Sequence, residues 1–184
     1  MKLQKRTDAT TSERKRILSV TIKRIADESP DFSYLGEFSN SADTEFAIEH
    51  GQPRGYRWFN PGTVESFNPD ADWLAKYPAK KRRDEWYKAM EQNAKQDYAR
   101  VCGYNDGQWY YMGIRAEATI QLTGDLTHRV SSGGLWGIES DSDKSYFAEV
   151  EADELANLQT ELHAMGFSKR AITAAFRDVQ RSDD

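Results

Sequence analysis

"QWYYMGIRAEATIQL", residues 108–122, decides the fold class of this chain. Apolar residues alternate with polar or small residues along the stretch, and this period of two is typical of a β-strand that buries one face. Asn105, Asp106 and Gly107 come just before it and favour a turn. We therefore predict a strand whose core-facing residues are Tyr110, Met112, Ile114, Ala116, Ala118, Ile120 and Leu122.

A second strand is predicted near the start of the chain. In "ILSVTIKRI", residues 17–25, Leu18, Val20 and Ile22 alternate with polar residues, and several of the side chains are β-branched. This combination favours a strand with one apolar face.

The segment after residue 122 predicts the second arm of an antiparallel hairpin. A Thr-Gly-Asp turn should lead the chain back through Val130 toward Trp136 and Ile138. The pair Gly133–Gly134 interrupts this arm, and glycine inside a strand indicates a bulge or a close backbone approach. We expect Trp136 and Ile138 to be buried, and Gly137 to let another backbone or ring come close.

Residues 84–101 predict a long amphipathic helix. Asp84 and Glu85 stand at its start, where the helix dipole favours negative charge, and Gly103 is expected as its C-cap. Spacings of three and four place its apolar residues on one face. These residues are Trp86, Met90, Ala94, Tyr98 and Val101.

The C-terminal part predicts a helical hairpin. Residues 143–165 form the first helix, in which a five-residue step between apolar positions indicates a break. Gly166 should adopt a left-handed conformation, and Ser168 should cap the second helix. The core-facing residues are expected to be Phe147, Val150, Leu155, Leu158, Leu162 and Met165, then Ala171, Ile172, Ala175, Phe176 and Val179.

These elements together predict an α+β fold, a mainly antiparallel sheet on which the long helix and the C-terminal hairpin pack. Residues 1–16 are expected to be a flexible basic arm and residues 17–184 a single domain. Residues 26–43 are predicted to be a loop held to the core by its aromatic side chains. The course of residues 44–83 is not predicted, beyond a short strand near Trp58, because prolines and glycines punctuate this region.

Charge is unevenly distributed along the chain, whose net charge is −5. Residues 1–30 and 76–101 are each +4, whereas residues 31–75 are −6 and residues 102–184 are −7. Such blocks mark either partner surfaces or solvated faces of one fold. The longest apolar runs are too short for a transmembrane helix, and the basic start lacks the apolar segment of a signal peptide. We therefore expect a cytoplasmic protein without a membrane partner.

The stretch "GGLWGIESDSD", residues 133–143, raises the question of a metal site. Glu139, Asp141 and Asp143 have the chemistry for Mg²⁺, but a calcium loop is excluded because Tyr146 and Ala152 occupy its two discriminating positions. The simpler interpretation is a helix start, where Ser140, Ser142 or Asp143 acts as the cap and acidic residues gather.

We accordingly expect no metal and no cofactor. The acidic residues are instead a candidate binding surface, and its members are Glu139, Asp141, Asp143 and Glu149.

The sharpest basic cluster is formed by Lys80, Lys81, Arg82 and Arg83. These cations are suited to phosphates, and the nearby Trp86 or Tyr87 could stack on a base. Trp86 also belongs to the apolar face of the predicted helix, so the cluster is equally explained as a solvated helix start. Nucleic acid is therefore kept as an alternative partner.

No catalytic residue is assigned. His50, His128 and His163 lie far apart without metal-ligand spacing, and His128, beside Arg129 with Glu117 expected opposite, is the best catalytic candidate. The single cysteine, Cys102, excludes an internal disulfide. Its position near a helix C-terminus disfavours the thiolate.

Three segments resemble a protein family of bacteriophages, plasmids and other bacterial mobile elements. They are "DESPDFSYLGEFS" (27–39), "QDYARVCGYNDGQWYYMGIRAEATI" (96–120) and "SSGGLWGIESDSDKSYFAEVEADELANL" (131–158). The resemblance implies the context of a mobile element but no activity, so no functional residue is carried over from it.

The resulting prediction is a non-enzymatic accessory protein that binds a macromolecule, with a host defence complex as the protein partner, in the manner of anti-CRISPR or antirestriction proteins. Two alternatives stay open. One is a nucleic-acid-binding regulator that uses Lys80–Arg83, and the other is a metal-dependent hydrolase that uses Glu139, Asp141 and Asp143.

Overall fold

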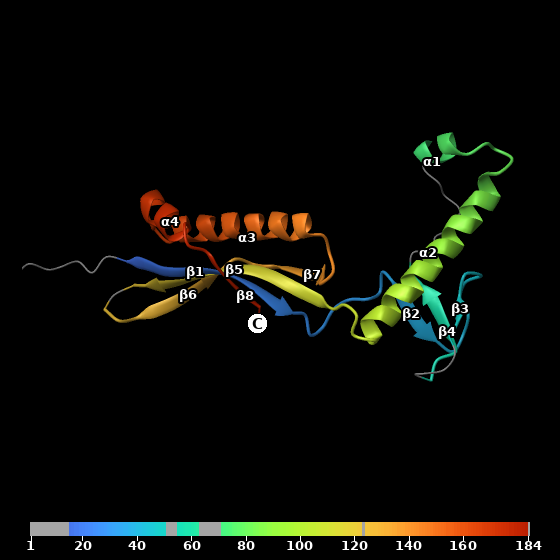
Figure 1. Ribbon diagram of the computed structural model, residues 1–184, viewed down its shortest axis with the longest axis horizontal. Helices are drawn as coiled ribbons and strands as arrows, with labels where there is room; N and C mark the ends of the chain where they lie inside the picture. Colours follow the sequence, from blue (N-terminus) through green and yellow to red (C-terminus); the bar gives the residue numbers. More distant parts are fainter. Residues whose placement is uncertain (1–14, 51–54, 63–70, 123, 184) are drawn as a thin grey trace, which may run out of the picture. The chain divides into compact units, whose positions relative to one another are not determined.

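The computed structural model describes residues 15–50, 55–62, 71–122 and 124–183 (Figure 1). It divides into two compact units, of which unit 1 comprises Met1–Glu28 and Tyr111–Asp184, and unit 2 comprises Ser29–Tyr110. Whereas the sequence suggested one domain over residues 17–184, each unit has a sheet and helices of its own. Most of the predicted N-terminal arm lies outside the described residues.

Unit 1 contains a five-stranded sheet, and its central strand, β5, is the strand predicted from residues 108–122 (Figure 1). The strand order is β6-β5-β1-β8, and β7 also pairs with β5. Every pairing is antiparallel except that of β1 with β8. The predicted α+β class and mainly antiparallel sheet are thus confirmed. The strands are β1 Arg16–Ala26, β5 Tyr111–Gln121, β6 Thr127–Ser131, β7 Leu135–Glu139 and β8 Gln180–Asp183.

Strands β6 and β7 lie one after the other along the same edge of β5, as the hairpin prediction required. Strand pairing with β5 is interrupted between Ser131 and Leu135. In this gap the Ser132 hydroxyl accepts a hydrogen bond from the backbone N–H of Ala116 at 2.9 Å. Gly134 follows with φ +81°, a value that L side chains rarely adopt. The predicted interruption at the glycine pair is therefore confirmed.

A β-bulge shapes β7. Ile138 pairs with Met112 and Leu135 with Ile114, so Trp136 and Gly137 both lie opposite Gly113. A Cβ atom on Gly113 would come within 2.4 Å of the Trp136 ring, whereas one on Gly137 would meet nothing within 4 Å. The close approach predicted for Gly137 is therefore wrong, and Gly113 is the residue that accommodates the ring.

One face of the sheet is buried under helices α3 (Lys144–Ala164) and α4 (Lys169–Ala175) (Figure 1). The alternating apolar residues of β5 from Met112 to Ile120 face this core, as predicted. The prediction failed for Tyr110, which is 51% exposed, and for Trp136, which is 45% exposed. The core consists of Val20, Ile22, Met112, Ile114, Ala116, Ala118, Ile120, Ile138, Phe147, Val150, Leu158, Leu162, Phe167 and Ile172.

Helix α3 runs without the predicted break. The step between apolar positions is filled by Glu151 and Glu154, two glutamates that are each only 6% exposed. At the other end of α3, Gly166 has φ +86° and the Ser168 hydroxyl accepts a hydrogen bond from the N–H of Ala171, as predicted.

The second C-terminal helix is shorter than predicted, because α4 ends at Ala175. The chain then forms β8, whose pairing with β1 was not predicted.

Unit 2 is built on helix α2, which runs over Arg82–Asn105 and so confirms and extends the predicted helix. Gly103 is buried inside it, and Asp106 occupies the C-cap position, so the predicted cap was wrong. The short strand predicted near Trp58 is β4, which pairs with β2, from the segment predicted to be a loop, and with the unpredicted β3 in a small antiparallel sheet of order β2-β4-β3. The other elements of unit 2 are β2 Gly36–Ser39, β3 Ile48–Glu49, β4 Trp58–Pro61 and α1 Ala71–Lys76.

Aromatic side chains form the interior of unit 2. Phe59 of β4 is fully buried, and its ring lies 5.3 Å from that of Phe38 and 5.5 Å from that of Tyr98. Phe32 packs edge-on against Tyr104 at 4.6 Å, which holds its segment to α2 as the sequence suggested.

Candidate functional site

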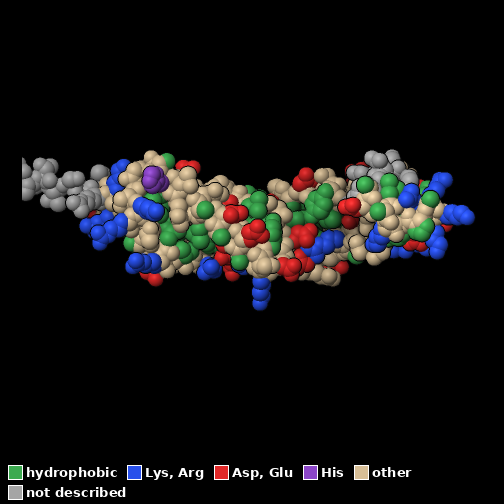
Figure 2. Space-filling model, turned by 90° about the horizontal axis from the view of Figure 1, so that it is seen from above, with side chains coloured by type: hydrophobic (Ala, Val, Ile, Leu, Met, Phe, Trp, Pro, Cys, Tyr) green, Lys and Arg blue, Asp and Glu red, His purple; other side chains and the backbone are tan. Residues whose placement is uncertain are grey.

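The predicted acidic residues lie around the start of α3. Asp143 occupies the N-cap position, as predicted, but its side chain makes no capping hydrogen bond. Asp141, Asp143 and Glu149 are exposed, whereas Glu139, at the end of β7, is half-buried. Acidic groups are visible over α3 in Figure 2.

These acidic residues do not gather around a common point. Across the described residues, no group of three or more histidine, cysteine or acidic side chains is arranged to hold a metal ion. The metal site that the hydrolase alternative needs from Glu139, Asp141 and Asp143 is therefore not formed.

The basic cluster at the start of α2 is partly committed to structure. Arg82 donates from its guanidinium to the backbone carbonyl oxygens of Tyr77 at 2.9 Å and Leu74 at 2.7 Å, which ties down the end of α1. Arg83 lies over the ring of Tyr87, and a hydrogen bond with Tyr87 raises the pKa of its guanidinium.

Two members of the predicted cluster, Lys80 and Lys81, remain exposed. The aromatic residues proposed to stack on a base are engaged elsewhere. Trp86 is buried against Phe46, and Tyr87 is also in contact with Phe46.

The three histidines lie apart. His50 is buried in unit 2, where its Nδ1 is 2.6 Å from the hydroxyl of Tyr98. Burial and a hydrogen bond with Cys102 raise the pKa of Tyr98. These contacts give His50 a role in the packing of unit 2.

His128 does not form the predicted pair with Glu117. His128 lies opposite Ile120 in the register of β6 and β5, and the side chain that reaches Glu117 is Arg129. His163 is exposed near the end of α3 and lines a shallow hollow of about 650 Å³ between α3 and α4.

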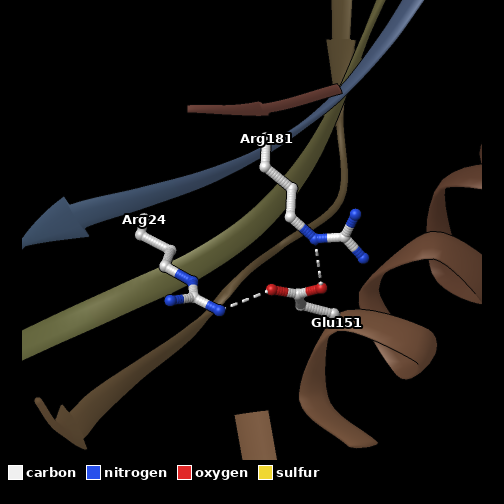
Figure 3. Close-up of polar contacts among 3 residues, drawn as sticks. All are labelled: Arg24, Glu151 and Arg181. Atoms are coloured by element: carbon white, nitrogen blue, oxygen red, sulfur yellow. Dashed lines mark hydrogen bonds and ion pairs between the residues drawn. The ribbon is translucent and has the colours of Figure 1, made fainter. Parts of the chain in front are cut away.

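An ion-pair cluster around the buried Glu151 joins α3 to two strands (Figure 3). Glu151 accepts from the guanidinium of Arg24 on β1 at 2.8 Å and from that of Arg181 on β8 at 3.0 Å. Arg24 also lies over the ring of Phe147, 4.9 Å from its centroid. Because the carboxylate is buried and both its oxygens are used, this cluster holds the last strand in the sheet.

Glu154, the other buried glutamate of α3, accepts a hydrogen bond from the backbone N–H of Gly134 at 2.9 Å. This contact ties the helix to the interruption between β6 and β7. The sequence could not indicate either glutamate as buried, because charged residues in a helix are ordinarily assigned to the solvated side.

The face of the sheet opposite α3 and α4 carries a different set of side chains. Alternation along paired strands places Lys23, Arg115, Glu117 and Arg129 on this face. The ring of Trp136 lies on the same face, because it covers Gly113, the neighbour of these residues on β5. We call these five residues the open sheet face.

Glu117 is almost buried within the open sheet face, yet its ion pairs are loose. The nearest nitrogen of Arg115 is 3.6 Å from it and that of Arg129 is 3.7 Å away, both longer than a hydrogen bond. Arg129 is largely exposed, and within the described part of the chain the buried Nε of Arg115 has no hydrogen-bond partner. Glu117 therefore holds the two guanidinium groups only through long ion pairs, and the guanidinium of Arg129 is accessible to solvent.

Comparison of the chain with models of protein families, with curated proteins and with the solved structures finds no match. In the described residues, no helix is both long and apolar enough to cross a membrane.

Proposed function

We propose that the protein acts by binding another macromolecule rather than by catalysis, as a cytoplasmic accessory protein of a bacterial mobile element. The partner class is a host defence complex, as for anti-CRISPR and antirestriction proteins. One observation carries the proposal. Asp141, Asp143 and Glu149 are exposed together around the start of α3, without converging on a metal or a catalytic partner.

An acidic surface of this kind suits a nucleic-acid-binding partner. Defence complexes bind DNA or RNA through basic grooves, and an acidic protein surface competes for the same cations. Tyr146 is 41% exposed within this acidic segment, and exposed tyrosine is common at the centre of protein interfaces.

The test is a plasmid-establishment assay in bacteria that carry an active CRISPR or restriction system. We expect the full chain to restore establishment of a targeted plasmid by about tenfold or more, the effect of about 1.4 kcal/mol of competing binding energy. The triple variant D141N/D143N/E149Q should lose this effect, because it removes three charges without changing side-chain size.

A variant with K169A/R170A on α4 serves as the matched control and should behave as the unmodified chain. If the unmodified chain leaves establishment unchanged in every defence system tested, the proposal is wrong. Equal activity of the triple variant would assign the effect to another surface.

A further inference from the structure

We propose that the open sheet face binds single-stranded nucleic acid, with an unpaired base stacked on Trp136 and phosphates paired with Arg115 and Arg129. This site lies on the side of the sheet opposite α3, so it is separate from the acidic surface and has a partner of different chemistry.

Local charge complementarity supports an anionic occupant. Strand register places four cations on this side of the sheet, because Arg16 lies opposite Gln121 next to the open sheet face. Three anions, Glu117, Glu139 and Asp27, lie on the same side, Asp27 because its backbone pairs with Tyr111 just beyond β1. The local net charge is therefore +1 in a chain whose net charge is −5.

Trp136 supplies the second feature. Its indole rests on Gly113, where any side chain would displace it, and 45% of its surface stays exposed. A large aromatic side chain held flat on a sheet is a platform for a base, since every base has a π-face. The structure thus maintains an exposed tryptophan near Arg115 at the expense of a side chain at position 113, because Arg115 and Trp136 both lie close to Gly134.

The polar character of the surrounding residues fits a nucleic-acid strand better than an apolar peptide. Thr21, Thr119, Gln121 and Ser131 lie on the same side of the sheet and supply hydroxyl and amide groups. The side chain of Arg129 is 75% exposed and that of Arg115 is 35% exposed, and phosphate oxygens accept two parallel hydrogen bonds from an accessible guanidinium. The ion pairs with Glu117 orient both guanidinium groups on this face, and their length of 3.6 and 3.7 Å means that no hydrogen bond to Glu117 must be broken when a phosphate binds.

The experiment is a fluorescence-anisotropy titration of the full chain against labelled oligothymidylate and oligouridylate of about 20 nucleotides, at about 50 and 200 mM salt. We expect saturable binding that weakens as salt rises. The slope of log K against log salt should be about −1.4, because two phosphates are paired, with Arg115 and Arg129, and each contributes about 0.7 on a single strand. A duplex of the same length should bind more weakly, since its bases cannot reach the indole.

Variants locate the binding surface. W136A should weaken binding about tenfold or more. R129A should reduce the salt slope by about 0.7, and it changes a side chain that is 75% exposed, so the fold is preserved. The matched controls are Y146A and K169A/R170A, which remove an equally exposed aromatic residue and two cations from the helical side of unit 1.

Four outcomes would overturn the proposal. The first is no binding at the lower salt concentration, and the second is equal binding of duplex and single strand. The third is binding that K80A/K81A/R83A abolishes while W136A leaves it intact, and the fourth is displacement of the oligonucleotide by an acidic peptide of equal charge at equal concentration. The last outcome would make the face a docking surface for an acidic protein. D141N/D143N/E149Q should bind the oligonucleotide as the unmodified chain does. A negative result in the oligonucleotide titration therefore does not depend on the result of the plasmid assay.

Discussion

The two faces of the unit 1 sheet each hold a nearly buried glutamate between two arginines, but the distances differ. On the helical side, Glu151 receives hydrogen bonds of 2.8 and 3.0 Å from Arg24 and Arg181 (Figure 3). On the other side, Glu117 lies 3.6 and 3.7 Å from its two arginines. The first arrangement joins a helix and two strands by hydrogen-bonded ion pairs, whereas the second holds its two arginines only by ion pairs that are longer than hydrogen bonds.

The largest effect should come from the helical side. E151A leaves two arginines without a buried counter-ion and removes the contact that holds β8, so we expect the free energy of unfolding to fall by roughly 2–3 kcal/mol. Chemical denaturation of the full chain measures this change.

The comparison variant is E117A, which breaks two long ion pairs with more exposed arginines and should cost less than about 1 kcal/mol. Equal losses of unfolding free energy in E151A and E117A would mean that the two clusters stabilise the fold equally, which would contradict the proposed difference between the two faces.

The next effect concerns the support of Trp136. G113A places a methyl group 2.4 Å from the indole ring, so the ring must move. We expect a loss of about 1–3 kcal/mol, as for other overpacked sites, and a change in tryptophan fluorescence.

G133A is the matched control, since a Cβ at Gly133 meets nothing within 4 Å. It should leave stability unchanged or raise it by up to about 1 kcal/mol. If G113A were as harmless as G133A, the indole would not rest where the structure places it.

The smallest effect should come from the helical hairpin. S168A removes the hydroxyl that accepts from the N–H of Ala171, which should lower stability by about 1 kcal/mol. S145A, an exposed serine in the first turn of α3, should have an effect within about 0.5 kcal/mol. A thermal melt of both variants separates the two cases, and equal midpoints would contradict the assigned cap.

The parts of the two units that could be predicted from the sequence are those with a regular period and local turn chemistry. Strand β5 shows its alternation, α2 its apolar spacing, and the α3–α4 connection its glycine and serine. Each signal comes from residues close together in the chain, so no knowledge of distant partners was needed.

The missed features depend on partners far away in sequence. β8 reads Gln-Arg-Ser-Asp, which has no strand pattern, and its contacts are with β1 and, through Arg181, with Glu151 of α3. Glu151 and Glu154 interrupt an apolar stripe and therefore suggested a break in the helix. Trp136 was expected in the core, because nothing local distinguishes an indole exposed over a glycine from a buried ring.

Two short strands of unit 2, β2 and β3, were missed for a different reason, whereas the short strand predicted near Trp58 is β4. These three strands have only two to four residues each, among prolines and glycines, and their pairing brings together residues that are 9 to 25 positions apart. The aromatic residues of this region gave the better signal, since Phe59 and Leu35 are buried.

Chemical-shift mapping would test most directly whether the helical face of the unit 1 sheet only stabilises the fold while the open sheet face binds nucleic acid. Oligothymidylate is added to the isotope-labelled full chain, and amide and indole N–H signals are followed. The account predicts shifts at Gly113, Arg115 and the Trp136 indole, with the signals of Ala156 and Thr160 on the outer side of α3 unmoved. Shifts confined to α3 or to residues 80–83, or no shifts at all, would contradict it.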